Sequence, residues 1–367
     1  MKIPFDEVFE DKTKYGTKIK TDDYHDAGAH IIIDQGQEQI AGYTDLEEGL
    51  FTDVPAIIFG DHTRIVKYVD TPFFLGADGV KVLRSRYENA NYKYLYFVLK
   101  NARIPNTGYN RHFKWLKELQ IPYPDSDIQA KIVSILEKAS AIVEKRQQQL
   151  SALDDLIKAR FVEMFGEPEH NSKSWPVQPL DSLCSVGSSK RIYQNEQSAD
   201  GVPFWRISDL VSKMDTGVAD SGLFIPEEKY LELRQSGLVP MAGDILVTSR
   251  GTLGRCYIIQ EEDRFYFQDG MISWLSNYAE NITPLYLQHL FTMNGFRKQI
   301  DGMQAGSTVA YLSIAMLKKL RIMVPSEEMQ SEFAAFVAQI DKTKSVIQKS
   351  LDETQLLFDS LMQKYFG

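Results

Sequence analysis

Residues 121–166 read IPYPDSDIQAKIVSILEKASAIVEKRQQQLSALDDLIKARFVEMFG, and residues 322–367 read IMVPSEEMQSEFAAFVAQIDKTKSVIQKSLDETQLLFDSLMQKYFG. The two stretches align over 46 residues without a gap, each with a proline near its start and Phe-Gly at its end. The shared identities include Ile121/Ile322, Pro124/Pro325, Gln129/Gln330, Leu150/Leu351, Leu156/Leu357, Phe165/Phe366 and Gly166/Gly367. A pattern that recurs after 201 residues predicts two copies of one structural unit.

The apolar residues of both stretches recur in a heptad-like register. In the first copy one row consists of Leu136, Val143, Leu150, Ile157 and Met164, beside Ile132, Ala139 and Leu153. In the second copy the rows are Val337, Leu351, Phe358 and Tyr365, beside Phe333, Ile340, Ile347 and Leu361. This spacing predicts one long helix per stretch, each about 60 Å long and with an apolar face that needs a helical partner. We expect the two helices to pair as an antiparallel coiled coil, with Arg146, Arg160 and Lys344 snorkelling at the edge of the seam.

The repeat extends upstream of both helices. Residues 94–99 and 285–290 are amphipathic helical stretches, and Ile3-Pro4 corresponds to Gln178-Pro179. Short strand-like runs such as 30–33, 56–59, 244–247 and 255–259 lie between them. The prediction is a mixed α/β fold in two copies, each followed by a long helix. The expected boundaries are a first domain at 1–125, a helix at 126–166, a linker at 167–174, a second domain at 175–325 and a helix at 326–367.

Charge and cysteine usage exclude several classes of protein. The 367 residues carry a net charge of −9, but residues 1–125 hold 16 basic against 19 acidic side chains and residues 172–325 hold 15 against 16. Both domains are thus nearly neutral, and charge alone does not predict nucleic-acid binding. Cys184 and Cys256 are too few for a disulfide scaffold and are expected to be reduced thiols. The N-terminal residues lack the pattern of a signal segment, so a cytoplasmic location is expected.

Several local phrases resemble a known family. They are Pro240–Val247 (PMAGDILV), the turn Gly251–Arg255 (GTLGR) and Gly306–Leu312 (GSTVAYL). Together with the repeat, they resemble the DNA-specificity subunit of type I restriction-modification enzymes over essentially the whole chain. The first copy departs from the third phrase, because Gly108–Phe113 reads GYNRHF.

The resemblance implies two target-recognition domains that read the two halves of a bipartite DNA target. It also implies that the helices set the gap between the halves and dock methyltransferase subunits, with restriction-translocase subunits in the full complex. No cofactor is expected.

No catalytic centre is expected in the chain itself. It contains no Asn-Pro-Pro-Tyr-like tetrapeptide for adenine methylation and no Gly-x-x-x-x-Gly-Lys-Ser/Thr phosphate loop. Its six histidines never pair at metal-ligand spacing on a helix, so no metal site is expected. A self-contained restriction enzyme is therefore excluded on motifs.

Candidate DNA contacts are polar or basic residues in the gaps between the expected strands, because such side chains suit phosphates and base edges. In the first domain they are Gln35, Gln37, His62, Arg64, Lys67, Tyr109, Asn110 and Arg111. In the second they are Lys190, Arg191, Tyr193, Arg206, Ser208, Ser249, Arg250, Thr252 and Thr308. The alternative function is a structural scaffold whose coiled-coil arms bridge partner proteins without reading DNA. The two domains share a framework but carry different polar residues in their loops. This difference favours DNA recognition over a purely structural scaffold.

Overall fold

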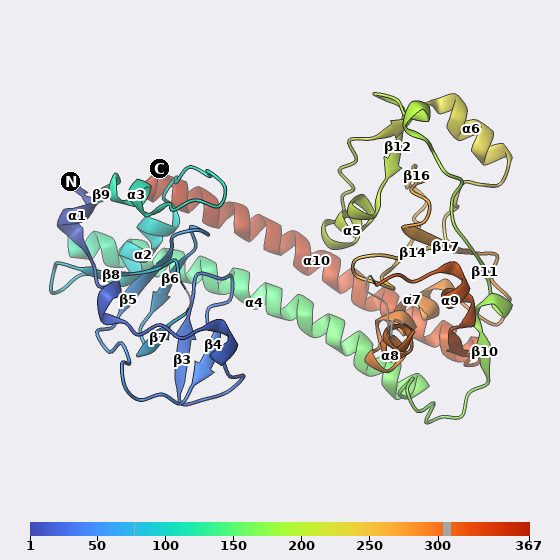
Figure 1. Ribbon diagram of the computed structural model, residues 1–367, viewed down its shortest axis with the longest axis horizontal. Coiled ribbons are helices and arrows are strands. Elements are labelled where there is room, and N and C mark those ends of the chain that lie inside the picture. Colours follow the sequence, from blue (N-terminus) through green and yellow to red (C-terminus); the bar gives the residue numbers. More distant parts are fainter. Residues whose placement is uncertain (77, 304–309) are drawn as a thin grey trace. The chain divides into compact units, whose positions relative to one another are not determined.

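The computed structural model describes residues 1–76, 78–303 and 310–367 (Figure 1). The chain divides into two compact units, and both long helices contribute to each. Unit 1 comprises Met1–Gln148 and Ile347–Gly367, and unit 2 comprises Gln149–Val346.

Unit 1 places short strands first and helices last. Its strands are β1 (Lys2–Pro4), β2 (Phe9–Asp11), β3 (His30–Ile33), β4 (Gly42–Thr44), β5 (Ala56–Gly60), β6 (Val66–Val69), β7 (Phe73–Leu75), β8 (Val80–Ser85) and β9 (Gln120–Pro122). Its helices are α1 (Phe5–Val8), α2 (Tyr92–Lys100), α3 (Phe113–Lys117) and the first part of α4 (Ser126–Phe165), with short 3-10 turns at Thr13–Tyr15 and Thr21–Asp23.

Unit 2 follows the same plan with additional helices. Its strands are β10 (Val177–Pro179), β11 (Ser185–Gly187), β12 (Val202–Trp205), β13 (Phe224–Ile225), β14 (Ile245–Thr248), β15 (Cys256–Ile258), β16 (Tyr266–Phe267), β17 (Ile272–Ser276) and β18 (Arg321–Met323). Its helices are α5 (Ile207–Thr216), α6 (Glu227–Gln235), α7 (Pro284–Thr292), α8 (Asn294–Gly302), α9 (Ile314–Lys319) and the first part of α10 (Glu327–Phe366), with 3-10 turns at Leu180–Ser182 and Gln194–Glu196.

The repeat predicted from the sequence is confirmed by the strand order. The four-stranded sheet runs β2-β8-β5-β6 in unit 1 and β11-β17-β14-β15 in unit 2. The three-stranded sheet runs β4-β3-β7 and β13-β12-β16, and each contains one parallel pair, β3 with β7 and β12 with β16. The small antiparallel pairs β1-β9 and β10-β18 join the start of each domain to the strand before its long helix. The fold is therefore mixed α/β in two copies, as expected.

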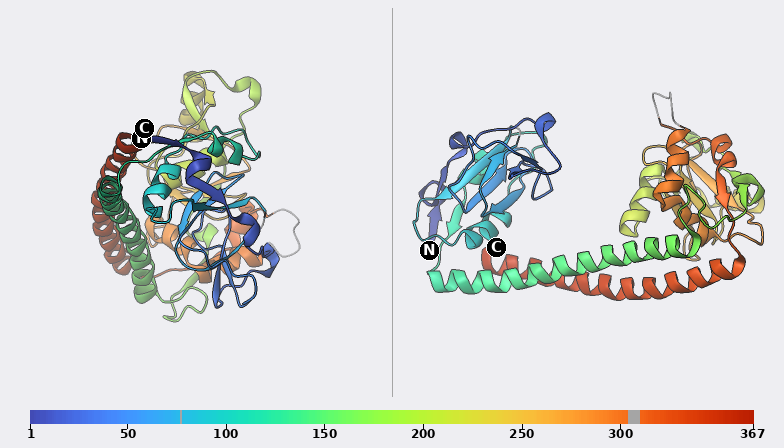
Figure 2. Two further views of the ribbon diagram at one scale, coloured as in Figure 1. Left: turned by 90° about the vertical axis from the view of Figure 1, so that its left-hand side faces the viewer. Right: turned by 90° about the horizontal axis from the view of Figure 1, so that it is seen from below.

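The long helices belong to the cores of both units. In unit 1 Leu136 and Ala139 of α4 share a buried cluster with Phe358 and Met362 of α10. In unit 2 the end of α4 shares a cluster with the start of α10, and the ring of Phe161 lies 5.5 Å from that of Phe333. The right-hand view of Figure 2 lets the reader follow α4 and α10 along their lengths. The start of one helix thus packs with the end of the other, while the coiled-coil register remains a prediction.

The repeated glutamine anchors the start of each long helix. Gln330 is 1% exposed, and its Oε1 accepts hydrogen bonds from the amide and the hydroxyl of Thr283 at 2.9 and 3.0 Å. Its Nε2 donates to the carbonyl oxygens of Asn281 and Pro325 at 2.9 and 3.0 Å. Gln129 makes the corresponding bond to the Pro124 carbonyl oxygen at 2.8 Å. These hydrogen bonds between the helix and the proline turn before it explain why glutamine occurs at this position in both repeats.

Two of the three charged residues that interrupt the heptad rows form ion pairs between α4 and α10, whereas Arg146 is half-buried on α4. Arg160 reaches Glu332 on α10 at 2.6 Å, and Lys344 reaches Asp154 on α4 at 2.6 Å. Both pairs lie within unit 2, and the side chains of Arg160 and Lys344 are 28% and 30% exposed. Snorkelling of their stems at the seam remains a prediction. Both cysteines are free thiols, and burial raises the pKa of the Cys184 thiol to about 12, which suits a structural residue.

Acid should weaken unit 2 through His289 on α7. Burial lowers the pKa of His289 to about 4, aided by the nearby Lys344 ammonium and opposed by Asp154. Since the unfolded chain takes up this proton near pH 6.5 and the folded chain only near pH 4, stability is present above 6.5 and is lost as the pH falls below it. We expect the free energy of unfolding to fall by about 2 kcal/mol between pH 7 and 5. Denaturant titrations at both pH values test this. The His289→Gln variant should show a smaller fall, and an equal fall would contradict the assignment.

Candidate nucleic-acid interface

The turn between β5 and β6 forms a partly exposed corner of unit 1, in which Thr63 is exposed, His62 is half-buried and Asp61 is buried. Asp61 fixes it: the Asp61 amide donates to the Gly79 carbonyl oxygen at 2.7 Å, and the carboxylate accepts from the Phe113 amide at 2.7 Å. The Asp61 carbonyl oxygen accepts from the amide of His112 at 2.8 Å. The loop that leads into α3 is thereby held across the turn.

Four of the predicted contacts meet at this corner. The His62 ring stacks on the Tyr109 ring with centroids 4.6 Å apart and planes at 8°. The His62 amide donates to Gln35 Oε1 at 3.1 Å, and the His62 Nδ1 lies 3.2 Å from the Asn110 carbonyl oxygen. Gln35 in turn donates from Nε2 to the Asp78 carbonyl oxygen at 3.0 Å. Arg111 is exposed on the same loop as Tyr109.

Of the other predicted residues of unit 1, Lys67 and Gln37 lie outside the turn, whereas Arg64 is part of it. Lys67 on β6 is 3% exposed, and its ammonium donates to the Glu38 carbonyl oxygen at 2.5 Å and approaches Asp34 at 3.4 Å. The structure therefore places Lys67 in the interior, and we leave it out of the interface. Arg64 is half-buried and donates to the Ile104 carbonyl oxygen at 3.3 Å. Gln37 is exposed on the β3–β4 connection.

Unit 2 builds the same corner between β14 and β15. The Ser249 amide donates to the Met271 carbonyl oxygen at 2.9 Å, and the Ser249 carbonyl oxygen accepts from the Leu312 amide at 3.0 Å. These bonds match those of Asp61, so Arg250 occupies the place of His62. The Arg250 guanidinium lies 5.2 Å from the centre of the Tyr311 ring, which parallels the stack of His62 on Tyr109. Gly251 has φ +69°, a left-handed value that glycine adopts without strain and that shapes the turn.

The remaining predicted residues of unit 2 are spread over three segments. Ser249 is buried, with its hydroxyl 2.8 Å from that of Ser273, so only its backbone serves the corner. Thr252 is exposed in the turn itself. Arg206 and Ser208 are exposed at the start of α5, and Lys190, Arg191 and Tyr193 are exposed on the segment after β11. Thr308 lies outside the described residues.

Unit 1 also contains three cations that the sequence did not single out. A cavity of about 730 Å³ is lined by Lys14, Lys18 and Lys81 together with Asp11. These lysines come from the segment after β2 and from β8, and only the topology of the sheet brings them together.

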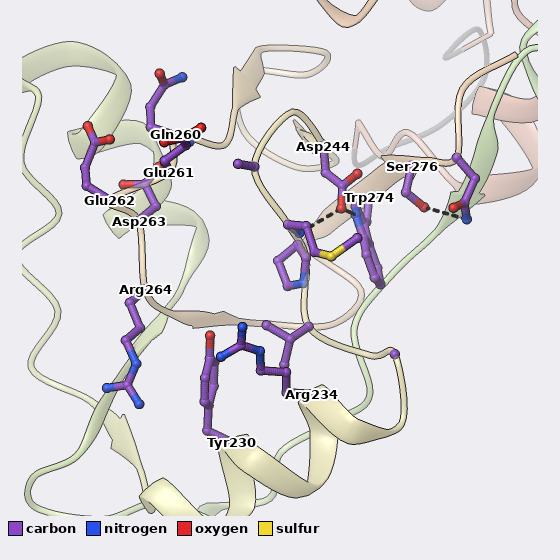
Figure 3. Close-up of a pocket in the computed structure, with 16 residues that line it drawn as sticks. Tyr230, Arg234, Asp244, Gln260, Glu261, Glu262, Asp263, Arg264, Trp274 and Ser276 are labelled. Carbon is purple, nitrogen blue, oxygen red and sulfur yellow. Dashed lines mark hydrogen bonds between the residues drawn. The ribbon is translucent and has the colours of Figure 1, made fainter. Parts of the chain in front are cut away.

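A second cavity, of about 690 Å³, opens at the far end of β14 in unit 2, between α6 and the 260–264 segment (Figure 3). The Asp244 carboxylate points at Trp274 and accepts from its Nε1 and from the Met241 amide, both at 2.9 Å. Burial raises the pKa of Asp244, while these two hydrogen bonds act in the opposite direction. Asp263 is held by Tyr257, by the Gln260 amide and by Lys213. The acidic groups thus stabilise the turn, and we assign no chemistry to this cavity.

The described part of the chain offers neither a metal-binding cluster nor a membrane-spanning helix. Residues 1–76, 78–303 and 310–367 hold no cluster of three or more His, Cys, Asp or Glu suited to a metal ion. Within the same ranges, no helix combines the length and apolarity required to span a bilayer.

Comparison with known proteins gives the family. Residues 2–152 and 172–355 match the type I restriction modification DNA specificity domain. A putative type I restriction enzyme specificity subunit of Haemophilus influenzae is 26% identical over 343 residues, covering 90% of this chain and 83% of the relative. The specificity subunit of the Escherichia coli type I restriction enzyme EcoR124I/EcoR124II is 24% identical over 371 residues, covering 95% and 88%.

Solved structures show the same fold. The S subunit of the type I restriction-modification system from M. genitalium superposes with a TM-score of 0.56 at 18% identity, covering 100% of this chain and 96% of that chain. A chain from a study of assembly of the type I R-M system gives 0.52 at 14% identity, covering 99% and 95%. The family match falls on both globular repeats, so the chain belongs to the type I restriction-modification DNA-specificity family and is a non-catalytic specificity subunit with two target-recognition domains.

Proposed function

We propose that each globular domain of this chain reads one half of a bipartite double-stranded DNA target through its exposed corner. The observation that carries the proposal is that one backbone frame presents different side chains in the two units. Unit 1 offers His62 beside Tyr109, whereas unit 2 offers Arg250 beside Tyr311. A shared frame with different donors is what two readers of different sequences require.

The chemistry of the corner fits base edges. Arginine recognises guanine through paired donors, and asparagine or glutamine recognises adenine. Arg250 in unit 2 and Asn110 in unit 1 are therefore the proposed sources of sequence recognition, while Gln35, whose amide bonds His62 and Asp78, is proposed to hold the corner in place. The outer candidates Gln37, Arg111, Lys190, Tyr193, Arg206, Ser208 and Thr252 extend this proposal.

We further propose that the long helices set the gap between the two half-sites. Each helix has 40 residues, which corresponds to about 60 Å. This exceeds one DNA turn of about 34–36 Å, so the spacer is long enough to separate two short tracts by an unread gap. The proposed domain boundaries are those expected from the sequence, and a cytoplasmic location follows from a DNA target.

The partner is proposed to be a methyltransferase subunit, docked on α4. Ile128, Ile135 and Ile142 recur every seven residues and are 47%, 41% and 45% exposed. A lysine follows each isoleucine by three residues, at 131, 138 and 145, and all three lysines are exposed. At the corresponding positions of α10, Met329 and Phe336 pack partly buried against the core of unit 2. The equivalent positions of α10 show that the repeated fold can cover such a stripe. We therefore propose that the exposed isoleucines of α4 bind a partner protein. Translocase subunits would join in a full restriction complex.

The Ile135→Glu variant should bind the methyltransferase subunit at least about tenfold more weakly, because a charge would enter a desolvated apolar stripe. The matched control is Leu231→Glu on α6, since Leu231 is 43% exposed and Ile135 is 41% exposed. Isothermal titration of the purified subunits measures both. Equal affinities for the two variants would place the docking surface elsewhere.

The reader and the scaffold interpretations are separated by one experiment. The chain is co-expressed with its cognate methyltransferase subunit, and methylated adenines are mapped genome-wide by single-molecule sequencing. A single bipartite motif with a fixed gap is the expected result. A stable complex without sequence-specific methylation would favour the scaffold.

A further inference from the structure

An ion pair with an exposed cation occurs at the same place in both units. Lys18 Nζ lies 2.6 Å from Asp78 Oδ1, and Arg191 Nε lies 2.9 Å from Asp269 Oδ2. Each cation follows the first strand of a four-stranded sheet, β2 or β11. Each aspartate precedes a glycine with positive φ, Gly79 at +96° or Gly270 at +69°, shortly before β8 or β17. The pair thus occupies matching places in the two repeats.

Stability does not explain why the pair is repeated. Both cations are well exposed, and exposed ion pairs contribute only about 0–1 kcal/mol. Lysine in one unit and arginine in the other preserve the positive charge while the residue type changes. The repeated property is therefore a cation held in a fixed place.

That place adjoins the proposed reading corner in both units. The Gly79 carbonyl oxygen, next to Asp78, accepts from the Asp61 amide at 2.7 Å. The Met271 carbonyl oxygen, two residues after Asp269, accepts from the Ser249 amide at 2.9 Å. The turn that carries the aspartate is thus hydrogen-bonded to the turn that carries His62 or Arg250.

More positive charge gathers around the pair. In unit 1 Lys14, Lys18 and Lys81 line one cavity with Asp11. Lys18 chiefly holds the pKa of Asp78 below its usual value, and Arg111 adds to this electrostatically. In unit 2 Lys190 precedes Arg191 and is exposed. Lys81 is itself paired with Asp11 at 3.4 Å. The charged groups named here for unit 1 are thus four cations and two carboxylates, although the whole chain has a net charge of −9.

We propose that Lys18 and Arg191 are equivalent phosphate-contacting residues, assisted by Lys14 and Lys81 in unit 1, that position each domain on its half-site. This rests on the proposed DNA-reading function. Two domains that recognise different base sequences both face the same phosphodiester backbone. A cation that is repeated in both domains is therefore expected to contact this backbone. The Asp side chains orient the cations, and the neighbouring corner reads the bases.

The test uses the complete complex with the methyltransferase subunit. Affinities for the cognate duplex and for an unrelated duplex are measured at several salt concentrations, and the methylation motif is mapped for each variant. Each lost phosphate contact should reduce the slope of log K against log[salt] by about 0.9 and weaken binding about fivefold at 0.15 M salt. We expect this for Lys18→Gln and Arg191→Gln separately. For the double variant we expect about twice the reduction in slope, about 1.8, and about 25-fold weaker binding at 0.15 M salt. The methylation motif should be unchanged in all three variants.

The matched control is Lys298→Gln, which removes another exposed lysine, paired with Glu169 at 2.6 Å. It should leave the salt slope unchanged. A slope equal to that of the wild type in Lys18→Gln and Arg191→Gln would overturn the inference, as would a relaxed base position in the motif. The wild-type complex is measured first: if it shows no motif at all, the DNA-reading function itself fails, and that outcome is distinct from an unchanged slope in a complex that still reads its target.

Discussion

The Phe161→Ala variant is expected to lose about 3–5 kcal/mol of the free energy of unfolding of unit 2. Phe161 is fully buried at the end of α4, where its ring stacks on Tyr286 of α7 at 5.5 Å and 18°. The same ring meets the edges of Phe165 at 4.8 Å and Phe333 of α10 at 5.5 Å. Removing it opens a cavity where a globular domain and both long helices meet, so the loss is both of transfer energy and of packing.

Denaturant unfolding followed by the fluorescence of the unit 2 tryptophans, Trp175, Trp205 and Trp274, measures this loss. The neighbouring Val162 is 37% exposed, so Val162→Ala should cost less than about 1 kcal/mol. A similar, small effect of both changes would show that the long helices are not part of the unit 2 core.

The second large effect is expected for Gln330→Leu, with about 3 kcal/mol lost from the start of α10. The leucine would leave the Thr283 amide and the carbonyl oxygens of Asn281 and Pro325 without their partner in a buried place. Unsatisfied buried polar groups cost about 1–3 kcal/mol each, and local relaxation recovers part of that sum.

The repeat supplies the control for this change. Gln129→Leu removes the equivalent residue, whose Nε2 bonds the Pro124 carbonyl oxygen, and should cost about 1 kcal/mol. Hydrogen exchange read by mass spectrometry resolves the first turns of α4 and α10 in one experiment. If hydrogen exchange in the first helical turn increased equally in the two variants, the additional hydrogen bonds of Gln330 would not contribute to stability as we expect.

The periodic parts of the fold were predictable from local patterns. The proline turns, the heptad rows and the terminal Phe-Gly predict helices that the structure places at Ser126–Phe165 and Glu327–Phe366. The parallel pairing of β3 with β7 was not predictable in this way, because it joins segments some 40 residues apart and no local signal specifies that contact. The equivalent parallel pair β12–β16 in unit 2 shows that this pairing is a general feature of the repeated fold.

The candidate site shows a similar division. The sequence predicts His62 and Asn110 as polar loop residues, and the structure brings them together. The same reasoning applies to Lys67 and Ser249, but both side chains are buried and hydrogen-bond other polar groups of the protein. The sequence alone does not show whether a polar side chain next to a strand faces solvent or a buried partner. Lys14, Lys18 and Lys81 were missed because a cluster drawn from separate segments exists only after folding.

The most direct measurement replaces residues 175–325 with the corresponding domain of another specificity subunit and maps the methylated motif of the resulting complex. If each domain reads one half-site and the helices set the gap, one half of the motif should change, while the other half and the gap stay the same. A motif altered in both halves, or in neither, would contradict two independent reading domains on a common spacer.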